Sequence, residues 1–155
     1  MRGNATEGVT LRTARRAGLD IFSAVVYYCS DESGQIMRIL AVEDEPEYLE
    51  MLEEVMKGIG HTISVADSAE RGLEILHDQP IDVVVSDVRM PQMDGLEFHR
   101  RVRSLPGHAN TPFIFLTGVK DLEAIRAQCS GDCDLFLQKP FPVDKLIAMF
   151  TGRLR

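Results

Sequence analysis

Five polar residues, widely spaced along the chain, are of the types needed to bind a metal ion and a phosphoryl group together. They are Glu43, Asp44, Asp87, Thr117 and Lys139. Each of them closes or follows a short run of apolar residues that is typical of a buried strand. Carboxylates are ligands for a hard cation, whereas a hydroxyl and an ammonium donate hydrogen bonds to an anion. The set therefore combines metal-binding and phosphoryl-binding groups.

The segments between these residues predict five strands that alternate with five helices. Strands are expected at 38–42, 62–66, 81–86, 112–116 and 134–137. Helices are expected at 46–59, after the capping residue Ser68, near 95–104, at 119–129 and at 142–153. Such alternation predicts a parallel sheet that right-handed crossover helices cover on both faces. The chain is thus expected to be an α/β domain.

The predicted sheet would bring the five polar residues to one edge. In an open parallel sheet, ligands bind beyond the carboxyl ends of the strands, and these residues lie at four such ends. Two carboxylates about 4 Å apart repel each other by about 4 kcal/mol at an effective dielectric constant of about 20. A cation between them relieves that repulsion, and Mg²⁺ fits because it prefers oxygen ligands and commonly joins carboxylates to a phosphate.

The same residues predict a reaction as well as a binding site. A carboxylate such as that of Asp87 needs no activating base and can attack phosphorus directly, which forms an acyl phosphate. Lys139 offers a mobile positive charge to a phosphoryl oxygen, and Thr117 can donate a hydrogen bond to another. Positioning and charge neutralisation then supply most of the catalysis, as in other phosphoryl transfers.

Composition excludes several other classes of protein. The 155 residues have a formal charge of −7, which argues against direct nucleic-acid binding. No apolar run approaches the roughly 20 residues of a membrane span. The three cysteines have no zinc-binding spacing, so we expect ordinary reduced thiols in a cytoplasmic protein.

Residues 1–36 differ from the rest of the chain. They contain four arginines and four acidic residues, so the whole charge of −7 belongs to residues 37–155. We interpret 1–36 as an N-terminal extension, disordered or the result of a misassigned start, and 37–155 as the functional domain.

Four motifs together resemble the receiver domain of bacterial two-component response regulators. They are ILAVEDEP at 39–46, SDVRMPQMDGLE at 86–97, FLTG at 115–118 and LFLQKPF at 135–141. The resemblance covers residues 37–153. It implies a flavodoxin-like, doubly wound parallel sheet of five strands in the order 2-1-3-4-5.

The resemblance also implies a role for each site residue. Asp87 would accept a phosphoryl group from the phosphohistidine of a sensor histidine kinase or of a histidine phosphotransfer protein. Asp44 and Asp87 would bind Mg²⁺ directly, Glu43 would act through water, and the backbone carbonyl of Arg89 would be a further ligand. By the same resemblance, Thr117 is the switch hydroxyl, Phe136 the rotating aromatic residue, and Lys139 the lysine that precedes a cis proline, Pro140.

Three positions depart from the commonest pattern of that family. Glu43 replaces an aspartate, which should shift the metal geometry slightly. Phe136 replaces a tyrosine, so a hydroxyl is lost while the packing role remains. Arg89 and Val119 stand where receiver domains tune the rate at which the phosphoryl group is lost.

These inferences predict a signalling switch that catalyses only its own phosphorylation and slow dephosphorylation. No DNA-binding motif follows residue 153, so we expect a stand-alone receiver that acts through a downstream target protein. The changing surface would be 119–153, where partners or a second copy would bind.

One alternative is a pseudo-receiver that binds partners without phosphorylation. A phosphatase with an aspartyl nucleophile is disfavoured, because that class needs a second acid where this chain has Arg89.

Overall fold

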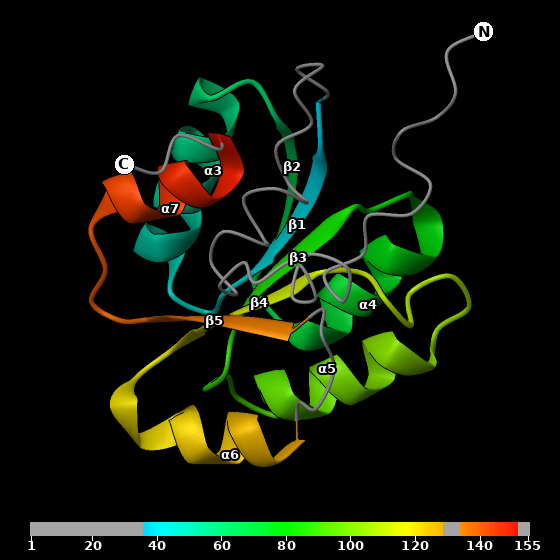
Figure 1. Ribbon diagram of the computed structural model, residues 1–155. Coiled ribbons are helices and arrows are strands. Elements are labelled where there is room, and N and C mark those ends of the chain that lie inside the picture. The colour runs from blue at the N-terminus through cyan, green and yellow to red at the C-terminus, as the bar shows by residue number, and fades with distance from the viewer. Residues whose placement is uncertain (1–35, 129–133, 152–155) are drawn as a thin grey trace, which may run out of the picture. The chain divides into compact units, whose positions relative to one another are not determined.

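The computed structural model describes residues 36–128 and 134–151, which belong to two units. The first unit, residues 36–141, contains a parallel sheet (Figure 1). Its strands are β1 (Arg38–Val42), β2 (Thr62–Ala66), β3 (Val83–Asp87), β4 (Phe113–Thr117) and β5 (Asp134–Gln138). They lie in the order β2-β1-β3-β4-β5, which confirms the predicted order.

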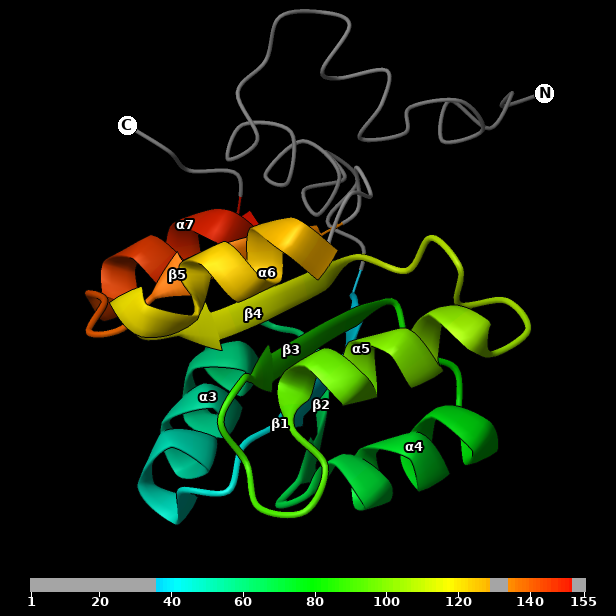
Figure 2. The ribbon, with the colours of Figure 1, turned by 90° about the horizontal axis from the view of Figure 1, so that it is seen from below.

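Helices cover both faces of this sheet. The first unit contains α3 (Pro46–Gly58), α4 (Ala69–Asp78), α5 (Gly95–Ser104), the short 3₁₀ helix η1 (Val119–Asp121) and α6 (Leu122–Gln128). Helix α3 lies on the side of the sheet opposite α4 and α5 (Figures 1 and 2). The second unit contributes α7 (Val143–Thr151). Within the described residues, no helix combines the length and the apolar character that a membrane span requires.

The central strands explain why the sheet is rigid where the site begins. Every residue of β3 and β4 is buried, as expected for parallel strands that are covered on both faces. Alternate residues of β1 and β4 and one residue of β3 form one hydrophobic cluster with residues of α4, α5 and α6, among them Leu40, Val84, Phe98, Phe113 and Ile125. The carboxyl ends of these strands are therefore fixed by packing on either side.

Most predicted boundaries agree with the structure to within two residues. The strand predicted at 81–86 begins two residues later, at Val83, and the carboxylate of Asp82 just before it accepts hydrogen bonds from the guanidinium and the backbone N–H of Arg38. The helix predicted at 119–129 is divided into η1 and α6, and its last residue lies outside the described residues, as do 152 and 153 of the last helix. The extension at 1–36 also falls outside them, apart from Ile36.

The turn after β3 depends on a glycine. The backbone N–H of Gly95, the first residue of α5, donates a hydrogen bond to the carbonyl of Val88 at 2.7 Å. A Cβ atom at Gly95 would overlap the carbonyl oxygen of Asp87 and lie 2.8 Å from Cα of Val88. Both are backbone atoms of a buried segment, so neither can move aside easily.

We therefore expect Gly95→Ala to lower the free energy of unfolding by about 2 kcal/mol, the usual cost of overpacking. Gly58→Ala is the matched control, because Gly58 ends α3 with open space around it. It should leave stability unchanged or raise it by up to about 1 kcal/mol. Urea denaturation followed by circular dichroism measures both, and equal stabilities of the two variants would contradict the expected overlap.

Candidate functional site

Three carboxylates gather at the carboxyl end of the sheet. Glu43 and Asp44 follow β1, and Asp87 ends β3, the neighbour of β1. One carboxylate oxygen from each residue lies within 4.8 Å of the others. Glu43 is fully buried and Asp87 is nearly so, whereas Asp44 is half-buried. Parallel pairing of β1 with β3 thus brings together acids that are 43 residues apart in sequence.

Glu43 is held deep in this cluster. Its backbone N–H donates to the carbonyl of Ala66 at 3.0 Å, and its Oε1 accepts a hydrogen bond from the N–H of Glu45 at 3.3 Å. Burial and the neighbouring charge of Asp87 raise the pKa of Glu43 to about 8, against the opposing effect of Lys139. A cation bound beside Glu43 would favour its charged form and so lower this pKa.

The two oxygens of Asp87 have different surroundings. Oδ1 accepts a hydrogen bond from the backbone N–H of Val88 at 2.8 Å, whereas Oδ2 lies 3.4 Å from the ammonium of Lys139. The loop that follows is anchored by Met90 and Met93, which are buried in the hydrophobic cluster. Asp94 then caps α5 by accepting a hydrogen bond from the N–H of Glu97 at 2.8 Å. The motif at 86–97 thus fixes the position of Asp87 on both sides.

Lys139 supplies the positive charge of the site. It follows β5, and its backbone N–H donates to the carbonyl of Thr117 at 2.7 Å. Its Nζ donates to Oε2 of Glu43 at 3.0 Å. Burial alone would lower the pKa of Lys139, but the interactions with Glu43 and Asp87 outweigh it and raise that pKa. The peptide bond between Lys139 and Pro140 is cis, as the resemblance implied.

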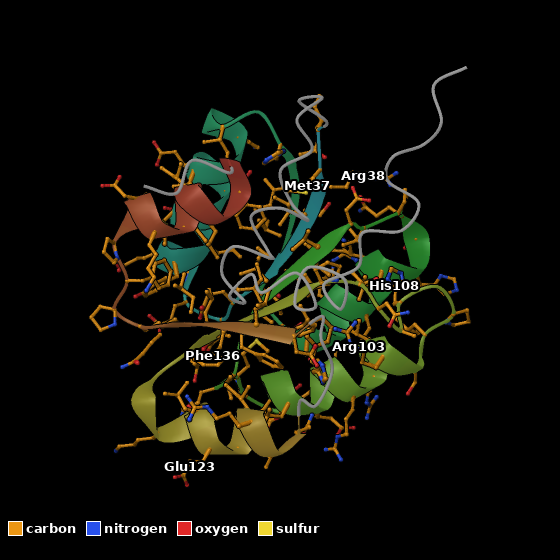
Figure 3. The ribbon with its side chains drawn as sticks, viewed as in Figure 1. Met37, Arg38, Arg103, His108, Glu123 and Phe136 are labelled. Atoms are coloured by element: carbon orange, nitrogen blue, oxygen red, sulfur yellow. The ribbon has the colours of Figure 1, made fainter. Side chains whose placement is uncertain are left out.

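The two predicted switch residues occupy different environments. Thr117 is fully buried at the end of β4, and its hydroxyl donates to the carbonyl of Gly118 at 2.9 Å. The register pairs Asp87 with Leu116, so Thr117 lies one residue beyond the partner of Asp87. Phe136 lies on β5 (Figure 3). The residue is 40% exposed, and the guanidinium carbon of Arg126 is 5.6 Å from its ring centroid. The aromatic side chain is therefore in an outward, partly covered position.

The chemistry of the cluster fits Mg²⁺. All three side chains offer oxygen, which suits a hard cation and not a metal that prefers imidazole or thiolate. A single ammonium, that of Lys139, contacts Glu43 and Asp87, so the site retains an excess of negative charge. Metal binding by the backbone carbonyl of Arg89 stays a prediction. The individual roles of the three carboxylates in holding the ion also stay predictions.

Sequence reasoning missed an ion pair beside the site. The guanidinium of Arg89 donates from Nε and Nη2 to the carboxylate of Asp121, at 3.0 and 3.3 Å. This pair links the loop after β3 to η1, and both residues line an open cleft of about 520 Å³. The two residues are 32 positions apart, and no local pattern signals such a contact.

The arginines at the end of α5 do not share one role. Arg100 and Arg101 form ion pairs with Glu97 of the same helix. Arg103 instead donates to Asp134 at 2.6 Å and to the carbonyls of His108 and Thr111 (Figure 3). Asp134 also pairs with Nε2 of His99 at 2.8 Å. Burial alone would raise the pKa of Asp134, but His99 and Arg103 outweigh it and lower that pKa.

The fold and the site together define a doubly wound α/β domain with an acidic, lysine-bridged site at the carboxyl ends of its strands. Residues 39–151 match the family model described as "Response regulator receiver domain". The chain belongs to this family. Receiver domains are switches of two-component signalling and bind Mg²⁺ at an acidic pocket, which in this chain is the cluster described above.

Individual relatives agree with this assignment. The chain is 31% identical over 113 residues to "Probable chemotaxis protein CheY" of Rhizobium etli, a match that covers 72% of this chain and 88% of that protein. It is 33% identical to "Response regulator MprA" of Mycobacterium leprae over 77% of this chain and 51% of that protein. Among solved structures, chemotaxis protein CheY4 of Vibrio cholerae superimposes with a TM-score of 0.68 at 26% identity, covering 77% of this chain and 100% of that one.

The crowding of like charges predicts that the site limits stability when no metal ion is bound. In the presence of a chelator, Asp87→Asn should raise the free energy of unfolding by about 1 kcal/mol, because it removes one of the repelling charges. Saturating Mg²⁺ should stabilise the unchanged protein more than the variant, and so reduce or reverse the difference.

The exposed residue Glu54, which lies in α3, provides a control for this measurement. Glu54→Gln removes one negative charge outside the cluster. It should change the free energy of unfolding by the same small amount in chelator and in saturating Mg²⁺. An Asp87→Asn variant that is less stable than the unchanged protein in chelator would contradict the electrostatic account.

Proposed function

We propose that this chain is a phosphoryl-accepting switch, phosphorylated on Asp87 from the phosphohistidine of a sensor histidine kinase or of a histidine phosphotransfer protein. One observation carries the proposal. The ammonium of Lys139 lies 3.4 Å from Oδ2 of Asp87 and 3.0 Å from Glu43, within a cluster of three carboxylates. A phosphoryl group attached to Oδ2 would therefore meet a positive charge already in place.

The proposed reaction is a displacement at phosphorus. Oδ2 of Asp87 forms a bond to phosphorus while the phosphorus–nitrogen bond of the phosphohistidine breaks, and the bonding electron pair returns to the imidazole nitrogen. The N–H of Val88 holds Oδ1 at 2.8 Å and so orients the carboxylate. Lys139 donates a hydrogen bond to a phosphoryl oxygen. Catalysis by this chain is limited to its own phosphorylation and slow dephosphorylation.

Four groups would hold the metal ion: Asp44 and Asp87 directly, Glu43 through water, and the backbone carbonyl of Arg89. When bound, Mg²⁺ would neutralise the carboxylates and the charge on the incoming phosphoryl group. The oxygen-only donor set supports this assignment.

The proposed switch begins at Thr117. A phosphoryl group on Asp87 offers its hydroxyl a stronger, charged acceptor than the carbonyl of Gly118, to which it now donates. Movement of Thr117 leaves room into which Phe136 turns from its exposed position. The surface of residues 119–153 then changes, and a downstream target protein or a second copy of the chain binds there. Such a switch needs two conformations separated by only a few kcal/mol.

A phosphorylation assay tests this function. After incubation with acetyl phosphate and Mg²⁺, intact-mass spectrometry should show one added phosphoryl group on the unchanged protein and none on Asp87→Asn. Asp94→Asn is the matched control, since it makes the same change in the same loop and asparagine caps helices as well as aspartate. It should accept the group. Failure of the unchanged protein to react, together with poor Mg²⁺ binding, would indicate a pseudo-receiver instead.

We further propose that residues 37–155 form the functional domain and that 1–36 is a dispensable extension. If the extension adds less than about 1 kcal/mol to the free energy of unfolding, a chain shortened to 37–155 should melt within a few degrees of the full chain. In a domain of this size, 1 kcal/mol shifts the melting midpoint by about 4 °C. Thermal denaturation followed by circular dichroism compares them. A much lower midpoint for the shortened chain would show that the extension packs against the domain.

A further inference from the structure

An aromatic ring lies against the ammonium of Lys139. The centroid of the Tyr48 ring is 4.2 Å from Nζ of Lys139, well inside the roughly 6 Å over which a cation–π attraction acts. Tyr48 is half-buried in the first turn of α3, directly after the acidic segment 43–45. Lys139 is itself only 17% exposed, so water screens this attraction weakly.

A second ring fixes the first one. Phe141, two residues beyond Lys139, packs against Tyr48 with ring centroids 6.4 Å apart and an interplanar angle of 56°. Tilted pairs of this kind are favourable for aromatic quadrupoles. Tyr48 at the start of α3 therefore makes two contacts with the segment after β5. One is with the ammonium of Lys139 and the other is with the ring of Phe141.

An aromatic neighbour leaves the N–H groups of the Lys139 ammonium available to a phosphoryl oxygen. Glu43 already accepts a hydrogen bond from Nζ, and Asp87 lies 3.4 Å away. A further carboxylate would add charge to a site that is already crowded. A ring attracts the cation without adding net charge and without taking an N–H in a strong hydrogen bond. It also restrains a flexible four-carbon side chain.

We propose that Tyr48 is a positioning residue: its ring holds the Lys139 ammonium beside Asp87, where that ammonium meets the phosphoryl group. The relevance to phosphorylation rests on the function proposed above. The placement of Lys139 by the ring is independent of that function, and it can be measured without any phosphoryl donor.

The first measurement is spectroscopic. In the full chain, the ring current of Tyr48 should shift the Lys139 side-chain resonances nearest Nζ upfield. Tyr48→Phe retains the ring and should retain this shift, whereas Tyr48→Leu should abolish it. Thermal denaturation checks that each variant folds, and Tyr48→Met replaces Tyr48→Leu if the leucine variant does not.

The second measurement is the rate of phosphorylation by acetyl phosphate at subsaturating concentration with saturating Mg²⁺. Tyr48→Leu should slow it about fivefold, as expected for loss of a partly desolvated cation–π contact, and Tyr48→Phe should restore it. In a Lys139→Ala background, Tyr48→Leu should have no further effect, because the ring acts through the lysine.

Three results would overturn the inference. They are an upfield shift that persists in Tyr48→Leu, a Tyr48→Phe variant that behaves like Tyr48→Leu, and an effect of Tyr48→Leu that is undiminished without Lys139. If the unchanged protein takes up no phosphoryl group, the proposed function fails, while the Lys139 shift still decides whether the ring positions the lysine.

Discussion

The repulsion between carboxylates at the carboxyl end of the sheet governs the rest of the site. Glu43, Asp44 and Asp87 place oxygens within 4.8 Å of one another, and such charges repel by several kcal/mol at this range. The parallel pairing of β1 with β3 makes this crowding unavoidable, since Glu43 and Asp44 follow one strand and Asp87 ends the other. Folding therefore places at this edge a charge that only cations can offset.

The elements around the site resist the movement that would relieve that repulsion. Asp87 ends a fully buried strand, and the close approach of Gly95 to its backbone leaves little freedom for the turn. Met90 and Met93 anchor the following loop in the hydrophobic cluster. Since the backbone holds the acids close together, the ammonium of Lys139 offsets part of their charge, and the pKa of Glu43 remains raised. The packing that holds the acids in place thus also keeps their charges close together.

Much of this arrangement could be predicted, because it depends on which residues end parallel strands. Asp87, Thr117 and Lys139 were expected at one edge for that reason alone, whereas the strand order came from the resemblance to receiver domains. The pairs Arg89–Asp121 and Tyr48–Lys139 were not predicted. They join side chains from distant segments, and tertiary packing sets such contacts, so no local pattern reports them.

The two ends of the sheet differ in how their buried acids are balanced by positive charge. At the amino end, Asp134 opens β5 and receives Arg103 and the ring of His99, so one acid has two partners and its pKa falls. At the carboxyl end, one ammonium contacts two of three clustered acids, and the pKa of Glu43 rises. Both clusters are buried in the same fold, yet only the second has unmet negative charge. This unmet negative charge is what suits the second cluster, and not the first, to a hard cation.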